Sequence, residues 1–133
     1  MIKPLVASLL LAIAASSVAL DAAAAPQTVD VQQAAALQSG GALLIDVRET
    51  GEYAEGHAPG SVLIPLGQLQ QRLPEIESYK DKPVVLICRS GNRSAKALKQ
   101  LQQAGFSAAS NIDGGMIAWK KAGLPIVSAG AGR

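Results

Sequence analysis

The sequence contains only one cysteine, Cys88, and only one histidine, His57. A single cysteine excludes a disulfide bond within the chain. Structural zinc sites usually need four cysteine and histidine ligands, so one residue of each type also excludes such a site within a monomer. The sequence therefore predicts no metal site, and its lone thiol calls for a chemical explanation.

The chain also lacks a strong charge of either sign. Its 12 lysine and arginine residues and 10 aspartate and glutamate residues give a formal net charge of +2, and no basic run is present. We therefore expect no nucleic-acid partner and no polybasic membrane anchor. The 133 residues are enough for one compact domain and too few for two. The oligomeric state stays open.

The first residues follow the order of a secretory signal. Lys3 precedes an apolar stretch, 5–20, and small residues occupy 22–25. The apolar stretch is shorter than the roughly 20 residues that a helix needs to cross a bilayer. We predict a signal peptide at 1–24, a single domain at 25–133, and an exported protein with no stable membrane association after cleavage. An uncleaved membrane anchor is the alternative.

After Pro26, short apolar runs alternate with helical patterns, which is typical of an α/β domain with a mainly parallel sheet. Asp30 is expected to cap the first helix, and Asp113 the last. Pro74 is expected to divide the helical segment 67–79 into two pieces. Strands are predicted at 42–47, 61–65, 83–87 and 108–112, and further helices at 31–38, 49–56, 94–104 and 113–123.

The segment Cys88-Arg89-Ser90-Gly91-Asn92-Arg93-Ser94 lies between a predicted buried strand and a predicted helix. The carboxyl end of a central parallel strand is a common ligand site, and successive backbone N–H groups at a helix start can form an anion-binding nest. With Arg89 and Arg93 nearby, this environment favours thiolate over thiol, so Cys88 is predicted to be a nucleophile. A buried and inert cysteine is the alternative.

Cys88 to Arg93 resembles the six-residue active loop of the rhodanese family, and further motifs extend the resemblance. These are Asp46-Val47-Arg48 with Glu52 and Tyr53, then Gly56-His57-Ala58-Pro59-Gly60-Ser61 with Leu63-Ile64-Pro65, and finally Asp113-Gly114-Gly115 through Trp119 to Gly123-Leu124-Pro125. The motifs occur in the family's order and cover nearly all of the chain after the predicted signal peptide. The one-domain, exported layout is similar to small periplasmic rhodaneses of the phage shock protein E kind, so we expect a periplasmic location.

The resemblance implies a five-stranded, mainly parallel sheet with helices on both faces, and a sulfurtransferase without metal or organic cofactor. Cys88 would attack a donor such as thiosulfate, hold its sulfur as a persulfide, and pass it to cyanide or a thiol acceptor. The loop residues Arg89, Ser90, Gly91, Asn92 and Arg93 would bind the substrate. Arg93, with Arg89 as a second candidate, would orient the sulfonate oxygens of thiosulfate.

Two other functions use similar residues. The first is a persulfide carrier or sensor that docks a partner without turnover, and the second is a rhodanese-like phosphatase or arsenate reductase. Those phosphatases and reductases have a loop one residue longer than the C-x4-R spacing between Cys88 and Arg93. A shorter loop makes a smaller cradle, which suits one sulfur atom better than a tetrahedral oxyanion.

Several neighbouring residues are expected to support the loop rather than to react: Asp46, Arg48 and Ser94. Asp46 could accept loop N–H groups, pair with an arginine, or act as an ordinary cap. Arg48 and Glu49 are interpreted as a surface pair. His57 is expected to brace its own loop with a hydrogen bond rather than act as a general base. Trp119 is predicted to belong to the core or to a cleft wall.

Overall fold

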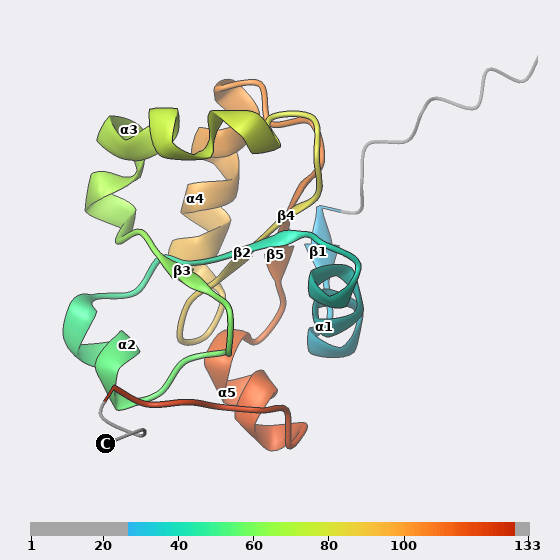
Figure 1. Cartoon of the computed structure of the whole chain (residues 1–133), viewed down its shortest axis with the longest axis vertical. Helices are drawn as coiled ribbons and strands as arrows, with labels where there is room; N and C mark the ends of the chain where they lie inside the picture. Colours follow the sequence, from blue (N-terminus) through green and yellow to red (C-terminus); the bar gives the residue numbers. More distant parts are fainter. Residues whose placement is uncertain (1–26, 130–133) are drawn as a thin grey trace, which may run out of the picture.

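The computed structural model describes residues 27–129, which form a five-stranded sheet with helices around it (Figure 1). The strands are β1 (Thr28–Val29), β2 (Leu43–Asp46), β3 (Val62–Leu63), β4 (Val84–Ile87) and β5 (Ala109–Ile112). They lie in the order β1-β5-β4-β2-β3, and every neighbouring pair is parallel. The predicted α/β fold is therefore confirmed. The predicted signal peptide, 1–24, lies outside the described residues.

The helices connect the strands as expected for parallel crossovers. They are α1 (Val31–Ser39), α2 (Thr50–Glu55), α3 (Leu69–Arg72), α4 (Asn92–Gln103) and α5 (Gly115–Lys121), with 3-10 turns η1 (Leu66–Gln68) and η2 (Leu73–Tyr79). Four strands were predicted; β1 was missed because two residues are too few to show a pattern. Within residues 27–129, every helix is too short or too polar to span a bilayer.

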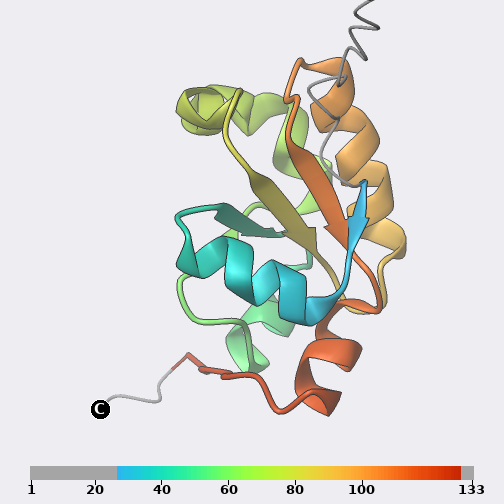
Figure 2. The same ribbon diagram turned by 90° about the vertical axis from the view of Figure 1, so that its right-hand side faces the viewer.

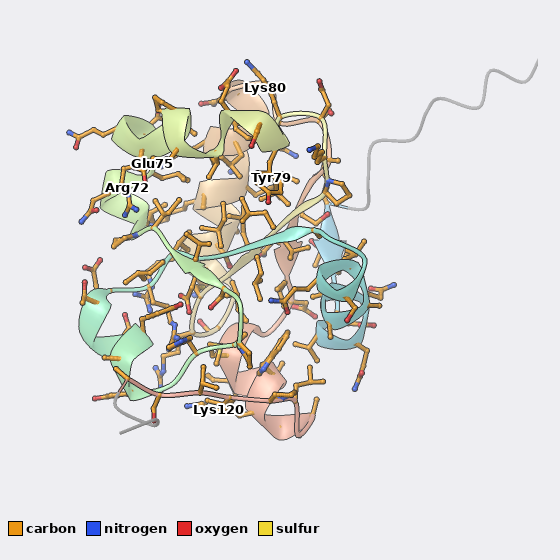
Figure 3. The ribbon with its side chains drawn as sticks, viewed as in Figure 1. Arg72, Glu75, Tyr79, Lys80 and Lys120 are labelled. Carbon is orange, nitrogen blue, oxygen red and sulfur yellow. The ribbon has the colours of Figure 1, made fainter. Side chains whose placement is uncertain are left out.

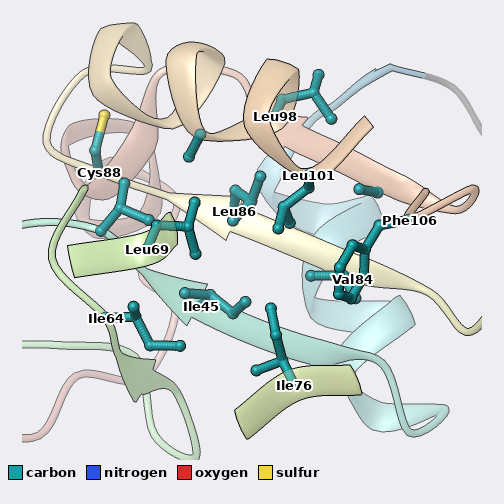
Figure 4. Packing of buried hydrophobic residues seen from close by; sticks show 13 residues of the cluster. Ile45, Ile64, Leu69, Ile76, Val84, Leu86, Cys88, Leu98, Leu101 and Phe106 are labelled. Carbon is teal, nitrogen blue, oxygen red and sulfur yellow. The ribbon is translucent and has the colours of Figure 1, made fainter. Parts of the chain in front are cut away.

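The central strand β4 is buried on both faces and joins two hydrophobic clusters. Val84, Leu86 and Cys88 belong to the cluster under α4, α3 and η2, part of which is drawn in Figure 4. Val85 and Ile87 belong to the cluster under α1 and α5. Figure 2 shows α1 and α4 on opposite sides of the strands. This alternation along β4 fixes the face on which the Cys88 side chain lies.

The predicted helix start at Asp30 is confirmed. The Gln33 N–H donates to Asp30 Oδ1 at 2.7 Å, and the Asp30 N–H donates to Gln33 Oε1 at 2.9 Å, which completes a capping box. The predicted break at Pro74 is also confirmed, because α3 ends at Arg72 and Pro74 lies in the first turn of η2.

The predicted cap at Asp113 is wrong. The N-cap of α5 is Gly114, which has a φ of 73° and cannot offer a side-chain acceptor. Helix starts leave backbone N–H groups without partners inside the helix. Here the N–H groups of Met116 and Ile117 donate to the carbonyls of Cys88 and Arg89, at 2.8 and 3.1 Å. The start of α5 is thus satisfied by the loop that follows β4 rather than by a side chain.

Candidate active site

The loop 88–93 leaves the carboxyl end of β4 and turns directly into α4. The helix begins at Asn92, two residues earlier than predicted, because Gly91 adopts a left-handed conformation with φ of 107° and serves as the N-cap. The Gly91 N–H donates to Cys88 Sγ at 3.1 Å, and the Ser94 hydroxyl donates to the same sulfur at 3.2 Å. Ser94, expected only to support the loop, therefore touches the sulfur directly.

Two opposing effects set the pKa of the Cys88 thiol. Burial, which leaves the residue 1% exposed, raises the pKa and is the largest single effect. Hydrogen bonds from the Ser94 hydroxyl and from the backbone N–H groups of Ser94, Gly91 and Ser90 lower it, and the pKa ends below its ordinary value of 9.0. The sequence predicted that a nest of backbone N–H groups, with Arg89 and Arg93 nearby, would stabilise the thiolate. The backbone donors are present, Ser94 adds a hydroxyl, and all the hydrogen bonds that lower the pKa of Cys88 come from neutral groups.

Two residues outside the loop fix its shape. Asn111 of β5 donates from Nδ2 to the Gly91 carbonyl at 3.3 Å. Gly115 lies so close to the start of the loop that an added Cβ would come within 2.7 Å of the Arg89 carbonyl carbon. Only glycine allows this approach, which lets α5 hold the Cys88 and Arg89 carbonyls. With these carbonyls held by α5, the backbone N–H groups of Ser90 and Gly91 are free to donate to Cys88 Sγ.

Arg93 pairs with Glu52 of α2. Its two terminal nitrogens donate to the two carboxylate oxygens at 2.6 and 2.9 Å. This bidentate contact is the main reason why the pKa of Glu52 falls to about 2. It is also the main reason why the pKa of Arg93 is raised, with a smaller contribution from the nearby Cys88. Both terminal nitrogens of Arg93 therefore already bind the Glu52 carboxylate. If Arg93 orients a sulfur donor, it does so while it is paired with Glu52.

Arg48 is a buried partner of Asp46, and the predicted surface pair of Arg48 with Glu49 is wrong. Arg48 Nη2 donates to Asp46 Oδ2 at 2.7 Å, and the Asp46 carboxylate is fully buried. The Arg48 guanidinium also donates to the carbonyls of Glu52 and Gly56. A buried carboxylate needs such a partner. Of the roles considered for Asp46, the structure shows two. Asp46 pairs with the Arg48 guanidinium, which anchors α2, and its Oδ1 also accepts the backbone N–H of Arg48 at 3.0 Å, as a local cap does.

His57 and Trp119 have structural positions. His57 Nδ1 lies 2.7 Å from the Tyr53 carbonyl oxygen, and the His57 ring stacks on the Tyr53 ring at 3.6 Å between centroids. The expected bracing hydrogen bond is thus present. Trp119 is buried in the core, where its Nε1–H donates to the Pro125 carbonyl at 2.8 Å.

A hollow of about 320 Å³ lies beside the loop. Arg89 lines it from the loop, Glu52 and Glu55 from α2, and Met116, Ile117 and Lys120 from α5. The side chains of Arg89, Ser90 and Asn92 are exposed. A larger and mainly apolar hollow, about 730 Å³, is lined by residues such as Ala42, Pro83 and Ala108 at the amino ends of the strands, and no residue of the loop lines it. The smaller hollow is therefore the one that adjoins the active loop, through Arg89.

Sequence reasoning assigned no site role to Asn111, Gly115, Glu52 or Lys120. A polar Asn111 in an otherwise apolar strand and the Gly114-Gly115 doublet were visible signals, although the doublet was interpreted only as a tight helix entry. Glu52 belongs to a motif of the family resemblance but was given no role, and nothing local marks Lys120. The positions of both residues depend on which elements meet. Among residues 27–129, no three histidine, cysteine, aspartate or glutamate side chains are grouped so that they could hold a metal ion.

Comparison with known proteins places this geometry in context. The family model of the rhodanese-like domain matches residues 30–122. A protein named sulfurtransferase from Allochromatium vinosum is 43% identical over 86 residues, which cover 65% of this chain and 78% of that protein. Thiosulfate sulfurtransferase 16 of Arabidopsis thaliana is 34% identical over 110 residues, covering 75% and 92% of the two chains. The crystal structure of a rhodanese-related protein from Thermoplasma volcanium superposes with a TM-score of 0.69 at 30% identity, over 76% of this chain and 97% of that one.

Proposed function

Because the chain belongs to the family of rhodanese-like domains, we propose that it moves a sulfane sulfur from a donor such as thiosulfate to cyanide or a thiol through a persulfide on Cys88. Sulfur transfer in general follows from the family and from its sulfurtransferase relatives. The observation that carries the finer proposal is the pair of hydrogen bonds from Gly91 and Ser94 to Cys88 Sγ. These two hydrogen bonds stabilise the thiolate form of Cys88 at the start of the loop.

The first half of the proposed reaction loads the protein. The Cys88 thiolate attacks the outer sulfur of thiosulfate, a new S–S bond forms, and the bond to the inner sulfur breaks. Sulfite leaves with the electron pair of that bond. No general base is invoked, because the hydrogen bonds from Gly91 and Ser94 favour the thiolate form of the nucleophile. This agrees with a His57 that is occupied in bracing its loop.

The second half of the proposed reaction transfers the sulfur from Cys88 to the acceptor. An acceptor such as cyanide or a thiolate attacks the outer sulfur of the persulfide, the S–S bond breaks, and Cys88 Sγ leaves as a thiolate. The N–H of Gly91 and the hydroxyl of Ser94 point at Sγ. They can therefore stabilise the same atom as nucleophile in the first half and as leaving group in the second.

Intact mass spectrometry tests the proposal. Thiosulfate is expected to add the mass of one sulfur atom, and cyanide or a thiol is expected to remove it. Cys88 is the only thiol in the chain, so Cys88→Ser should show neither the adduct nor turnover. No mass change under excess thiosulfate, or full turnover in Cys88→Ser, would refute the persulfide mechanism.

Activity assays on the same protein distinguish a sulfurtransferase from a sulfur carrier and from a phosphatase. Rapid production of thiocyanate from thiosulfate and cyanide supports the enzyme, whereas a stable persulfide with negligible turnover supports a sulfur carrier. Release of phosphate from an aryl phosphate would indicate a phosphatase, which the short C-x4-R loop disfavours.

A further inference from the structure

The hollow beside the active loop has charges that the proposed steps with thiosulfate and cyanide do not use. Two of its charged residues are already neutralised, since Arg48 pairs with Asp46 and Glu52 pairs with Arg93. Three are left without an ion-pair partner among the described residues: Arg89, Lys120 and Glu55. Unpaired charges that line one hollow can recognise charges on a ligand.

The unpaired charges are divided between two sides of the hollow. The cations come from the active loop and from α5, and the carboxylate comes from α2. Figure 1 shows α2 and α5 at the same end of the molecule, and Figure 3 labels Lys120 on α5, far from Tyr79 and Lys80 at the other end. A ligand with an anionic group and a cationic group matches this division.

The size of the hollow also exceeds what the simplest substrates need. Its volume is about 320 Å³. That is at the lower end of the roughly 300–1,000 Å³ of small-molecule sites, and about ten times the ~30 Å³ that one water occupies in the liquid. Cyanide or thiosulfate would leave most of this space unfilled. Met116 and Ile117 add apolar contacts that suit methylene groups.

We propose that this hollow binds the sulfur acceptor and that the acceptor is a small zwitterionic thiol. Its carboxylate lies toward Arg89 and Lys120, and its ammonium group lies toward Glu55. This inference rests on the persulfide mechanism proposed above, and it adds the class of acceptor and the three charged residues that select it.

The transfer itself balances without a further reactant. A persulfide places its outer sulfur one S–S bond, about 2 Å, beyond Cys88 Sγ. The acceptor thiolate attacks that outer sulfur, a bond forms between the two sulfurs, and the bond to Sγ breaks. Cys88 leaves as a thiolate, and the acceptor leaves as a persulfide with the transferred sulfur.

The test compares four thiols as acceptors for the sulfur-loaded protein: cysteine, 3-mercaptopropionate, cysteamine and 2-mercaptoethanol. They carry both charges, only the anion, only the cation, and neither. Each variant is compared with the unaltered protein using the same thiol, so that intrinsic thiol reactivity cancels. Because a salt bridge near the surface contributes at most a modest free energy, we expect changes of about fivefold in kcat/KM that weaken with added salt.

Lys120→Gln is expected to lower kcat/KM for cysteine and 3-mercaptopropionate about fivefold relative to its effect on 2-mercaptoethanol. Glu55→Gln is expected to lower the value for cysteine and cysteamine by a similar factor, and not that for 3-mercaptopropionate. Lys121→Gln is the matched control, because Lys121 is the next exposed lysine of α5 and does not line the hollow. It should leave all four values unchanged.

The result that overturns the inference is a Lys120→Gln protein whose four values change by one common factor, or no more than in Lys121→Gln. Turnover with cyanide and the sulfur adduct on Cys88 are measured on the same samples. If cyanide turnover and the sulfur adduct are normal but the effect of Lys120→Gln does not depend on the charge of the thiol, the proposed acceptor site is wrong and the persulfide mechanism stands. If no sulfur is loaded, both proposals fail.

Discussion

Ser94 provides the side-chain hydrogen bond to Cys88, and it does so from a fully buried position at the start of α4. A hydroxyl can donate to a thiolate more strongly than to a thiol, because the acceptor is charged. This contact and the backbone donors outweigh the desolvation of the sulfur, which on its own would keep Cys88 protonated. The pKa of Cys88 is therefore set by a balance between burial and a few neutral donors.

Ser94→Ala should shift this balance toward the thiol. The pKa of Cys88 is expected to rise, so the curve of Cys88 alkylation rate against pH moves to higher pH. At neutral pH a smaller thiolate fraction and a lost transition-state contact should reduce kcat/KM for thiosulfate roughly tenfold. Ser90→Ala is the control for the alkylation curve, because Ser90 acts through its backbone N–H, which alanine retains. An unmoved curve in Ser94→Ala would show that the hydroxyl does not stabilise the thiolate.

At the scale of elements, the active loop is held between three neighbours. Helix α5 binds the Cys88 and Arg89 carbonyls, β5 binds the Gly91 carbonyl through Asn111, and α2 binds Arg93 through Glu52. The loop itself is short and could adopt other turns. Its N–H groups converge on the sulfur because its carbonyls are held elsewhere.

Gly115→Ala tests whether the contact of α5 with the loop matters. Gly115 and Gly123 both have positive φ, 53° and 70°, so alanine at either position carries a left-handed backbone cost of about 1–2 kcal/mol. Only at Gly115 would the new Cβ also overlap the Arg89 backbone, whereas nothing lies within 4 Å at Gly123. We expect Gly115→Ala to lower the free energy of unfolding in urea by about 2 kcal/mol more than Gly123→Ala. It should also slow Cys88 alkylation at neutral pH. Equal effects of the two variants would mean that α5 does not fix the loop.

At the scale of the whole molecule, the parallel sheet brings the carboxyl ends of β2, β4 and β5 to one edge. The segments that follow these strands supply Glu52, the active loop and Lys120. The order β5-β4-β2 makes them neighbours although they are far apart in sequence. A ligand site at this edge is the expected consequence of the topology.

Export concerns the whole protein and stays a proposal. We expect cleavage between Ala24 and Ala25, which would leave β1, beginning at Thr28, intact. N-terminal sequencing of the protein from a periplasmic fraction should therefore begin at Ala25. A protein that keeps Met1 and remains with the membrane would instead support an uncleaved anchor.

Local patterns in the sequence were sufficient for most of the fold and singled out Cys88 as the candidate nucleophile. Alternating apolar runs and turn residues predicted four of the strands and the order of the helices, because periodicity and capping act within a few residues. The loop from Cys88 to Arg93 indicated a nucleophile, because a short turn between a buried strand and a helix presents its N–H groups at that point.

The tertiary structure decided which residues pair with the arginines and which residues surround the active loop. The sequence could not predict that Arg93, expected to orient the donor, also pairs with Glu52, which lies 41 positions away in the sequence. Arg48 was predicted to pair with its neighbour Glu49, yet it pairs with Asp46, because a fully buried carboxylate needs a charged partner. Asn111 and Gly115 meet the loop, and Lys120 lines the hollow beside it, only because β5 lies beside β4. Local chemistry is set by residues close in sequence, whereas charge pairing, loop shape and the walls of the hollow depend on elements that only the folded chain brings together.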